Sequence, residues 1–127
     1  MTSLQTTLDD NTLEKLSAQH LDRYMHRVAM TRKYVDQHFR DNLGIPTAPC
    51  LDILLALQIT ADEPQSAEDI ANHICETVPI TRRYLNLMVS KGFVEMEAED
   101  IRLTSKGAED LSYIIGQVYG DYLQPIE

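Results

Sequence analysis

The sequence lacks the features that mark several large classes of protein. Its 127 residues contain only two cysteines, Cys50 and Cys75, which are too few for a disulfide framework. No uninterrupted apolar run approaches the roughly 20 residues that a membrane span requires. Positive charge is also scarce, with 11 Lys and Arg against 20 Asp and Glu and a formal net charge of -9. We therefore expect a cytoplasmic protein of one domain without a membrane segment.

Signals for catalysis and for metal binding are missing as well. The chain has no glycine-rich phosphate loop, nucleophile motif or pair of catalytic carboxylates. His20, His26 and His38 fall on one expected helix, but not at the separations of three or four residues that place metal ligands side by side. The sequence thus predicts neither an enzyme nor a metal site, and it indicates no cofactor.

Each cysteine lies in an otherwise apolar helical stretch, so the first interpretation of both is a buried small hydrophobic residue. The alternative is a redox sensor. Nothing basic adjoins Cys50 to lower the pKa of its thiol, whereas His73 lies two residues before Cys75.

What the chain does have is an ordered series of short elements between Ser66 and Gly107. Ser66 can cap a short helix that runs to Ile74 and carries two carboxylates in its first turn. Pro79 suits the first position of a second helix, and Gly92 suits the residue that ends it.

Two alternating segments follow the second helix. Residues 93–97 and 101–104 alternate apolar and polar side chains in the manner of half-buried strands, and residues 98–100 can turn the chain between them. The predicted order is helix, turn, helix and a small two-stranded wing, in a mainly α-helical protein.

Helical geometry divides the second helix, residues 79–91, into two faces. The inner face carries Thr81, Tyr84, Leu85 and Met88. The outer face carries Ile80, Arg82, Arg83, Asn86, Leu87 and Lys91. Arg and Asn pair bidentately with guanine and adenine edges in the major groove of DNA. No acidic residue occurs from Thr77 to Val94, so this helix is a candidate reader of duplex DNA.

The two ends of the chain form broad apolar helices, residues 11–42 and 105–123. One small domain covers only part of such a surface, so we expect a homodimer. The side chains expected at the dimer interface are Leu21, Met25, Val28, Leu111, Ile115, Val118 and Tyr122. The alternative is that both helices simply pack on their own domain.

Together these segments resemble the MarR family of bacterial winged helix-turn-helix transcription regulators. The resemblance spans roughly residues 11–123 and includes the loop Leu-Gly-Ile-Pro-Thr-Ala-Pro at 43–49. Gly92-Phe93-Val94 is similar to the family's entry into its wing, and Leu103-Thr104-Ser105-Lys106-Gly107 is similar to its exit.

The resemblance implies a flexible N-terminus over residues 1–10 and one MarR-like domain over 11–127. Within that domain it implies a DNA-reading core at 46–104 between the two dimerisation helices. It also implies a homodimer that binds duplex DNA and regulates transcription without catalysis. A small-molecule effector is a further candidate partner, in a pocket for which Tyr24, Tyr34 and His38 are candidates, although the same side chains fit core packing.

Charge sets this chain apart from the family's pattern. Arg102 and Lys106 complete the candidate DNA contacts, but Glu97, Glu99 and Asp100 stand where the family's wing carries Asp-x-Arg-Arg. An acidic wing either lies close to the phosphates and repels them or stays away from DNA. The alternative function is a winged-helix module for protein interaction or dimerisation that does not bind DNA.

Overall fold

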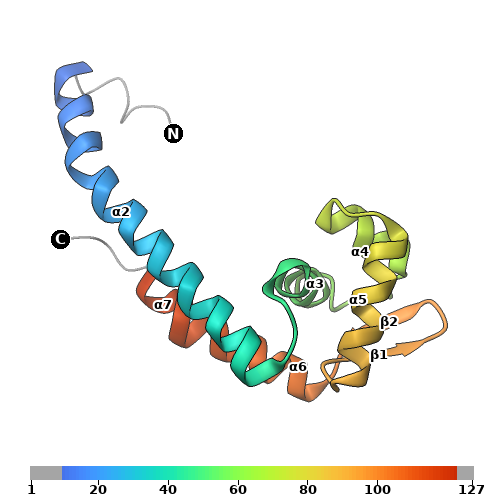
Figure 1. The fold of residues 1–127 in the computed structure, drawn as a ribbon. Coiled ribbons are helices and arrows are strands. Elements are labelled where there is room, and N and C mark those ends of the chain that lie inside the picture. The colour runs from blue at the N-terminus through green and yellow to red at the C-terminus, as the bar shows by residue number, and fades with distance from the viewer. Residues whose placement is uncertain (1–9, 123–127) are drawn as a thin grey trace.

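The computed structural model of the chain describes residues 10–122. The elements in chain order are α2 (Asp10–His38), η1 (Phe39–Leu43), α3 (Thr47–Ile59), α4 (Ala67–Ile74), α5 (Val78–Ser90), β1 (Val94–Glu97), β2 (Asp100–Leu103), α6 (Ser105–Tyr113), η2 (Ile114–Val118) and α7 (Tyr119–Tyr122). The long α2 lies beside η2 and α7 and forms an arm, while α3, α4, α5 and the two strands form a compact unit at the other end (Figure 1). The expected mainly helical winged architecture is confirmed.

The apolar stripe of the first helix has two different environments. Val35 and Phe39 are buried in the core of the protein, whereas Leu21 and Met25 are 55% and 61% exposed. The part of the helix that is covered packs beside η1, η2 and α7. The N-terminal part extends past the compact unit (Figure 1).

Local capping defines the two helices of the reading unit, α4 and α5. The Ser66 hydroxyl accepts from Asp69 N–H at 3.1 Å, and the Asp69 carboxylate accepts from Ser66 N–H at 3.0 Å, which makes a capping box. The Thr77 hydroxyl caps α5, with Pro79 in its first turn. Gly92 follows α5 with a φ of +84°. The predicted helix signals are therefore confirmed.

The strands β1 and β2 pair as an antiparallel hairpin, which we call the wing. Val94 pairs with Leu103 and Glu97 with Asp100, and Ala98 turns the chain with a φ of 54°. Ile101 N–H donates to Gln65 C=O at 3.0 Å, so the strand that returns from the tip is tied to the start of α4.

A single core joins the reading unit to the arm. Its largest fully buried side chains include Phe39, Phe93, Ile53, Leu54, Ile70, Leu85, Met88 and Ile114. None of the helices described within residues 10–122 is by itself long and apolar enough to cross a membrane. The segments His20–Leu43 and Thr47–Ile59 meet at a bend of 87°, and they are long and apolar enough only when the two are counted together.

The two cysteines differ from each other. Cys50 is fully buried, as expected, and burial raises the pKa of its thiol to about 12. The interpretation of Cys75 as a buried residue was wrong, because its side chain is exposed. Cys75 follows the last residue of α4 in the left-handed conformation, with a φ of 58°, and its N–H closes the end of the helix.

Candidate nucleic-acid interface

Helix α5 presents most of the outer face that its sequence predicts, except that Leu87 is partly buried and packs against the core. Thr81, Leu85 and Met88 have no exposed surface, whereas Arg82, Arg83 and Asn86 are exposed. Ile80 is 41% exposed and belongs to the same outer surface. The Thr81 hydroxyl donates to Thr77 C=O at 2.8 Å, which fixes the first turn from the buried side. The helix is thus packed on the core by its inner face.

The candidate cations of the wing lie in a different situation. Arg102 Nε lies 3.0 Å from both carboxylate oxygens of Asp100, and Glu95 faces it across the strands. The hydrogen bond to Asp100 raises the pKa of Arg102, and the charge of Asp100 adds to this effect. Arg102 is therefore already engaged in an ion pair of the protein itself.

The Lys106 side chain contacts the base of the wing. Its Nζ donates to Lys91 C=O at 3.2 Å, at the C-terminal end of α5, where a cation meets the negative end of the helix dipole. The same Nζ lies 4.6 Å from the centre of the Phe93 ring, within cation–π range. The seven residues predicted to contact DNA therefore fall into three groups. Four lie on the outer face of α5, Lys91 lies at its end, and Arg102 and Lys106 contact other groups of the protein.

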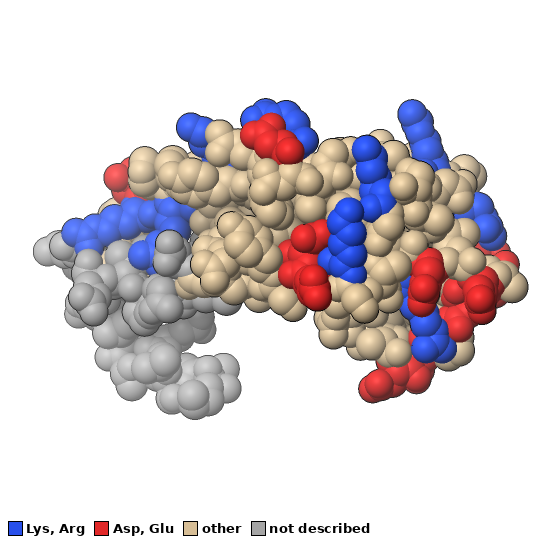
Figure 2. All heavy atoms as spheres, turned by 90° about the horizontal axis from the view of Figure 1, so that it is seen from below, with Lys and Arg blue, Asp and Glu red and all other residues tan. Residues whose placement is uncertain are grey.

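Both signs of charge occur at the reading end of the molecule. Lys and Arg side chains project there next to a group of Asp and Glu side chains (Figure 2). The local run from Thr77 to Val94 has three basic residues and no acidic one, against a net charge of -9 for the whole chain. The positive potential of this end is thus restricted to the surroundings of α5.

The predicted dimerisation residues divide by environment too. Leu21, Met25 and Ile115 are exposed, Val28 and Val118 are partly buried, and the side chain of Tyr122 lies outside the described residues. Leu111 is only 4% exposed and packs in the core of its own chain, which places it away from a free surface. Large apolar side chains that sequence reasoning did not include in this set, Tyr24, Tyr34 and Tyr113, are also exposed.

A cavity of about 500 Å³ lies between α2 and the last helical segments. It forms where two π-helical segments, η1 and η2, widen their helices, a distortion that is common at functional sites. Its walls consist of Arg27, Met30, Thr31, Tyr34, Gln37, His38, Asp41, Asn42, Tyr113, Gln117 and Val118. The volume is in the range of small-molecule sites.

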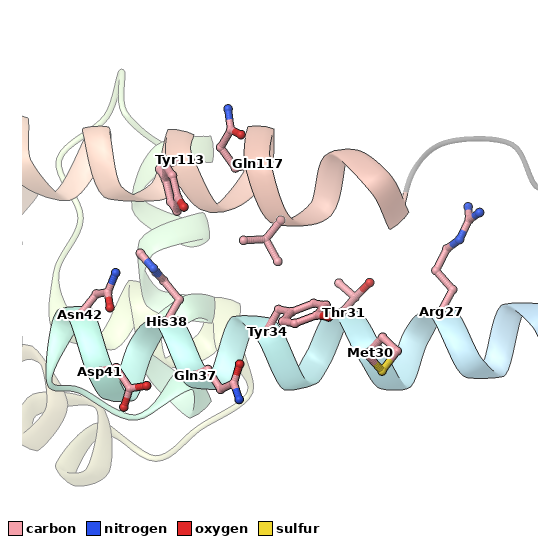
Figure 3. A pocket seen from close by; sticks show the side chains of 11 residues that line it. Arg27, Met30, Thr31, Tyr34, Gln37, His38, Asp41, Asn42, Tyr113 and Gln117 are labelled. Atoms are coloured by element: carbon pink, nitrogen blue, oxygen red, sulfur yellow. The ribbon is translucent and has the colours of Figure 1, made fainter.

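His38 and Tyr113 face each other in this cavity from the two helices (Figure 3), with ring centres 5.0 Å apart and a stacked geometry. The Nε2 atom of His38 is buried and has no hydrogen-bond partner among the described residues. Tyr34 and His38 line the cavity as expected, but Tyr24 does not. Sequence reasoning missed Tyr113 and Gln117, since only the pairing of distant helices brings them opposite His38.

Comparisons with known proteins agree with this architecture. No protein-family model matches the sequence, and no curated protein matches it. Among solved structures, MepR from Staphylococcus aureus, a transcription regulator of the multidrug efflux pump MepA, is similar with a TM-score of 0.66 at 17% identity, over 82% of this chain and 77% of that chain.

Two further structures are similar as well. The multiple antibiotic-resistance repressor MarR from Listeria monocytogenes has a TM-score of 0.65 at 18% identity, over 90% of this chain and 78% of its own. A MarR family protein from Bacillus stearothermophilus has a TM-score of 0.56 at 20% identity, over 90% and 79%. With α4 and α5, its wing and its long terminal helices, the chain therefore has the MarR-like winged helix-turn-helix fold.

Proposed function

We propose that this protein is a homodimeric transcription regulator of the cytoplasm that binds duplex DNA and has no catalytic activity. The observation that carries the proposal is the exposed face of α5, where Arg82, Arg83 and Asn86 project from a helix that is rigidly packed on its other side. These side chains have the donor geometry that recognises guanine and adenine in the major groove. The similar structures named as transcription regulators support the same function.

Dimerisation is the second part of the proposal. Leu21, Met25 and Ile115 expose apolar side chains along the arm, on α2 and on η2. Several large apolar side chains exposed on one arm are typical of a protein interface. A second copy of the chain covers it by two-fold symmetry, and symmetry then sets two α5 helices on two half-sites of DNA.

DNA binding can be tested by selecting duplexes from a random-sequence pool and measuring affinity by fluorescence anisotropy. Arg83→Gln should weaken binding to the selected duplex by about 1–3 kcal/mol and relax preference at one base pair if Arg83 reads a base. If it contacts phosphate instead, all sequences should weaken alike. The matched control is Lys33→Gln, which removes the same charge from an exposed position on α2. If Arg83→Gln and the matching single variant Arg82→Gln both bind as tightly as the parent, α5 is excluded as the reader.

The dimer can be tested by sedimentation at micromolar concentration. Ile115→Asp should dissociate or destabilise the dimer, because it leaves a charge unpaired in an apolar interface. Ser112→Asp, which adds the same charge at an exposed polar position of α6, is the control. A monomeric mass of the parent across that range, with ordinary thermal stability, would contradict this part of the proposal.

A protein-interaction module without DNA binding is the second candidate function. The net charge of -9 and the engagement of Arg102 and Lys106 by protein groups favour it, because DNA-binding domains normally carry a broad basic surface. Failure of the parent protein to bind any selected or random duplex at low salt would make this the leading function.

The cavity beside His38 is where we propose that an effector binds. Gln37, Asn42 and Gln117 offer hydrogen bonds to a ligand from the walls of the cavity, and the exposed rings of Tyr34 and Tyr113 offer stacking surface. His38→Ala should then abolish the response of DNA affinity to an effector found by ligand screening, while the affinity of the free protein for DNA stays the same.

A further inference from the structure

The wing carries a charge opposite to that of α5. Between Val94 and Leu103 there are four acidic residues and one basic residue, a net charge of -3. The acidic ones are Glu95, Glu97, Glu99 and Asp100, of which the three glutamates are exposed. A hairpin that enters a groove of DNA needs cations at the surface that faces the phosphates. This wing presents the opposite charge there.

The cations near the wing do not offset these acids at the tip. Arg102, the one basic residue of the strands, is held by Asp100, and Lys106 is held at the root of the wing by Lys91 C=O and the Phe93 ring. Among the described residues, neither Glu97 nor Glu99 has a salt-bridge partner. The carboxylates of Glu97 and Glu99 are therefore exposed to solvent and to any molecule that binds beside the wing.

The strand register sets a like-charge pair at the tip. Glu97 lies directly opposite Asp100. Like charges in directly opposed positions destabilise an antiparallel pair, so the stability of the hairpin alone does not explain them. The role of Glu97 and Asp100 therefore concerns a molecule that the wing approaches.

The wing also lies close to anything that α5 binds. Phe93 N–H donates to Met88 C=O at 3.0 Å, and Thr104 N–H donates to Phe93 C=O at 3.1 Å, so β1 begins and β2 ends near the C-terminal end of α5. The two elements lie side by side in Figure 1. A four-residue strand extends about 13 Å, and the major groove is about 12 Å wide. A wing of this length, with its base at the end of α5, is long enough to reach the phosphates that border a groove occupied by α5.

We propose that the wing of this protein acts on DNA by repulsion instead of entering a groove. Glu97 and Glu99 weaken binding to every duplex, so that only sequences that give α5 its full set of base contacts are held. This inference rests on the proposed DNA-binding function. It assigns Glu97 and Glu99 as residues that lower the affinity for every duplex without touching a base, so that weak sites stay unoccupied, and it assigns Arg102 and Lys106 to the folding of the wing.

The test is the double variant Glu97→Gln/Glu99→Gln, which leaves the Arg102–Asp100 ion pair in place. Its affinity for one selected duplex and one random-sequence duplex is measured by anisotropy from about 50 mM to 1 M salt. We expect binding to both duplexes to tighten by about two- to tenfold at the lowest salt. The gain should disappear toward 1 M, where the Debye length is only about 3 Å.

Two controls accompany this measurement. Asp22→Asn/Asp36→Asn changes the net charge equally at exposed positions of α2 and should change affinity by less than about twofold, because those positions lie on the arm and not on α5 or the wing. Arg83→Gln reports separately whether α5 binds DNA. Thermal unfolding of the wing variant shows how much the loss of the Glu97–Asp100 repulsion stabilises the fold.

The outcomes separate the two proposals. Unchanged affinity of the wing variant, together with weakened binding by Arg83→Gln, would overturn the repulsive wing and leave the DNA-binding function intact, even if the variant melts at a higher temperature. Weaker binding by the wing variant would also overturn it, since the glutamates would then contribute attractive contacts. If neither the parent nor any variant binds a duplex at low salt, the proposed function fails, and the inference fails with it.

Discussion

Replacing Gly107 by alanine tests how closely α6 approaches the base of the wing. A methyl group at this position would lie 2.1 Å from the carbonyl oxygen of Phe93 and 3.0 Å from its carbonyl carbon. These are backbone atoms, so the clash is not relieved by rotation of a side chain. The same Phe93 carbonyl accepts a hydrogen bond from Thr104 N–H at 3.1 Å, and any movement that makes room for the methyl group disturbs this bond.

The expected effect is a net destabilisation of about 2 kcal/mol. Overpacking of a tight site typically costs about 1–3 kcal/mol, and the rigid neighbour places Gly107 at the upper end. Alanine recovers about 0.5–1 kcal/mol because it favours the helix more than glycine does. For a chain of this size, a net loss of about 2 kcal/mol lowers the melting temperature by about 5–10 °C.

Thermal and urea unfolding, followed by circular dichroism at one fixed protein concentration, measures this difference. The control is Ser112→Ala on the exposed side of α6, which changes helix propensity without adding a group near the wing. It should shift stability by about 0.5 kcal/mol or less. If Gly107→Ala unfolds at the same midpoint as the Ser112→Ala control, the close approach of α6 to Phe93 is not a constraint in the folded protein, and the argument fails.

Three further predictions concern local chemistry. Ser66→Ala should lower the free energy of unfolding by about 1 kcal/mol because it removes the cap of α4, as measured by urea denaturation. The hydrogen bonds from Ser66 lower the pKa of Asp69. The stability contributed by Asp69 is therefore fully present above its ordinary pKa and is lost as the pH falls through the lowered value. Asp69→Asn should flatten the plot of unfolding free energy against pH below about pH 4. In the native protein at pH 8, a thiol reagent should modify Cys75 rapidly and Cys50 only on unfolding, because burial raises the pKa of Cys50 to about 12. Fast modification of two thiols per folded chain would contradict that assignment.

The sequence by itself determined the features that depend on neighbours within one or two turns. Ser66 and Asp69 are three residues apart, so their capping box follows from helical geometry alone. The period of Thr81, Leu85 and Met88 selected the buried face of α5 in advance, because only one face of a helix can contact the core. The wing was equally readable, since alternation and the turn between the strands are both local signals.

Only the tertiary structure decided which groups remain free to act. Lys106 was a candidate DNA contact in sequence, but the return of the chain brings its Nζ within 3.2 Å of Lys91 C=O, 15 residues away. The ion pair of Arg102 with Asp100, by contrast, is local, because the two residues lie two positions apart on β2. Leu111 and Ile115 share an apolar pattern, yet one is in the core and the other is exposed. The period of apolar residues shows that a residue belongs to the apolar face of a helix, but not whether another segment covers it. The position of the neighbouring helix decides which residues of that face are buried, and this position depends on contacts between segments that are distant in the chain.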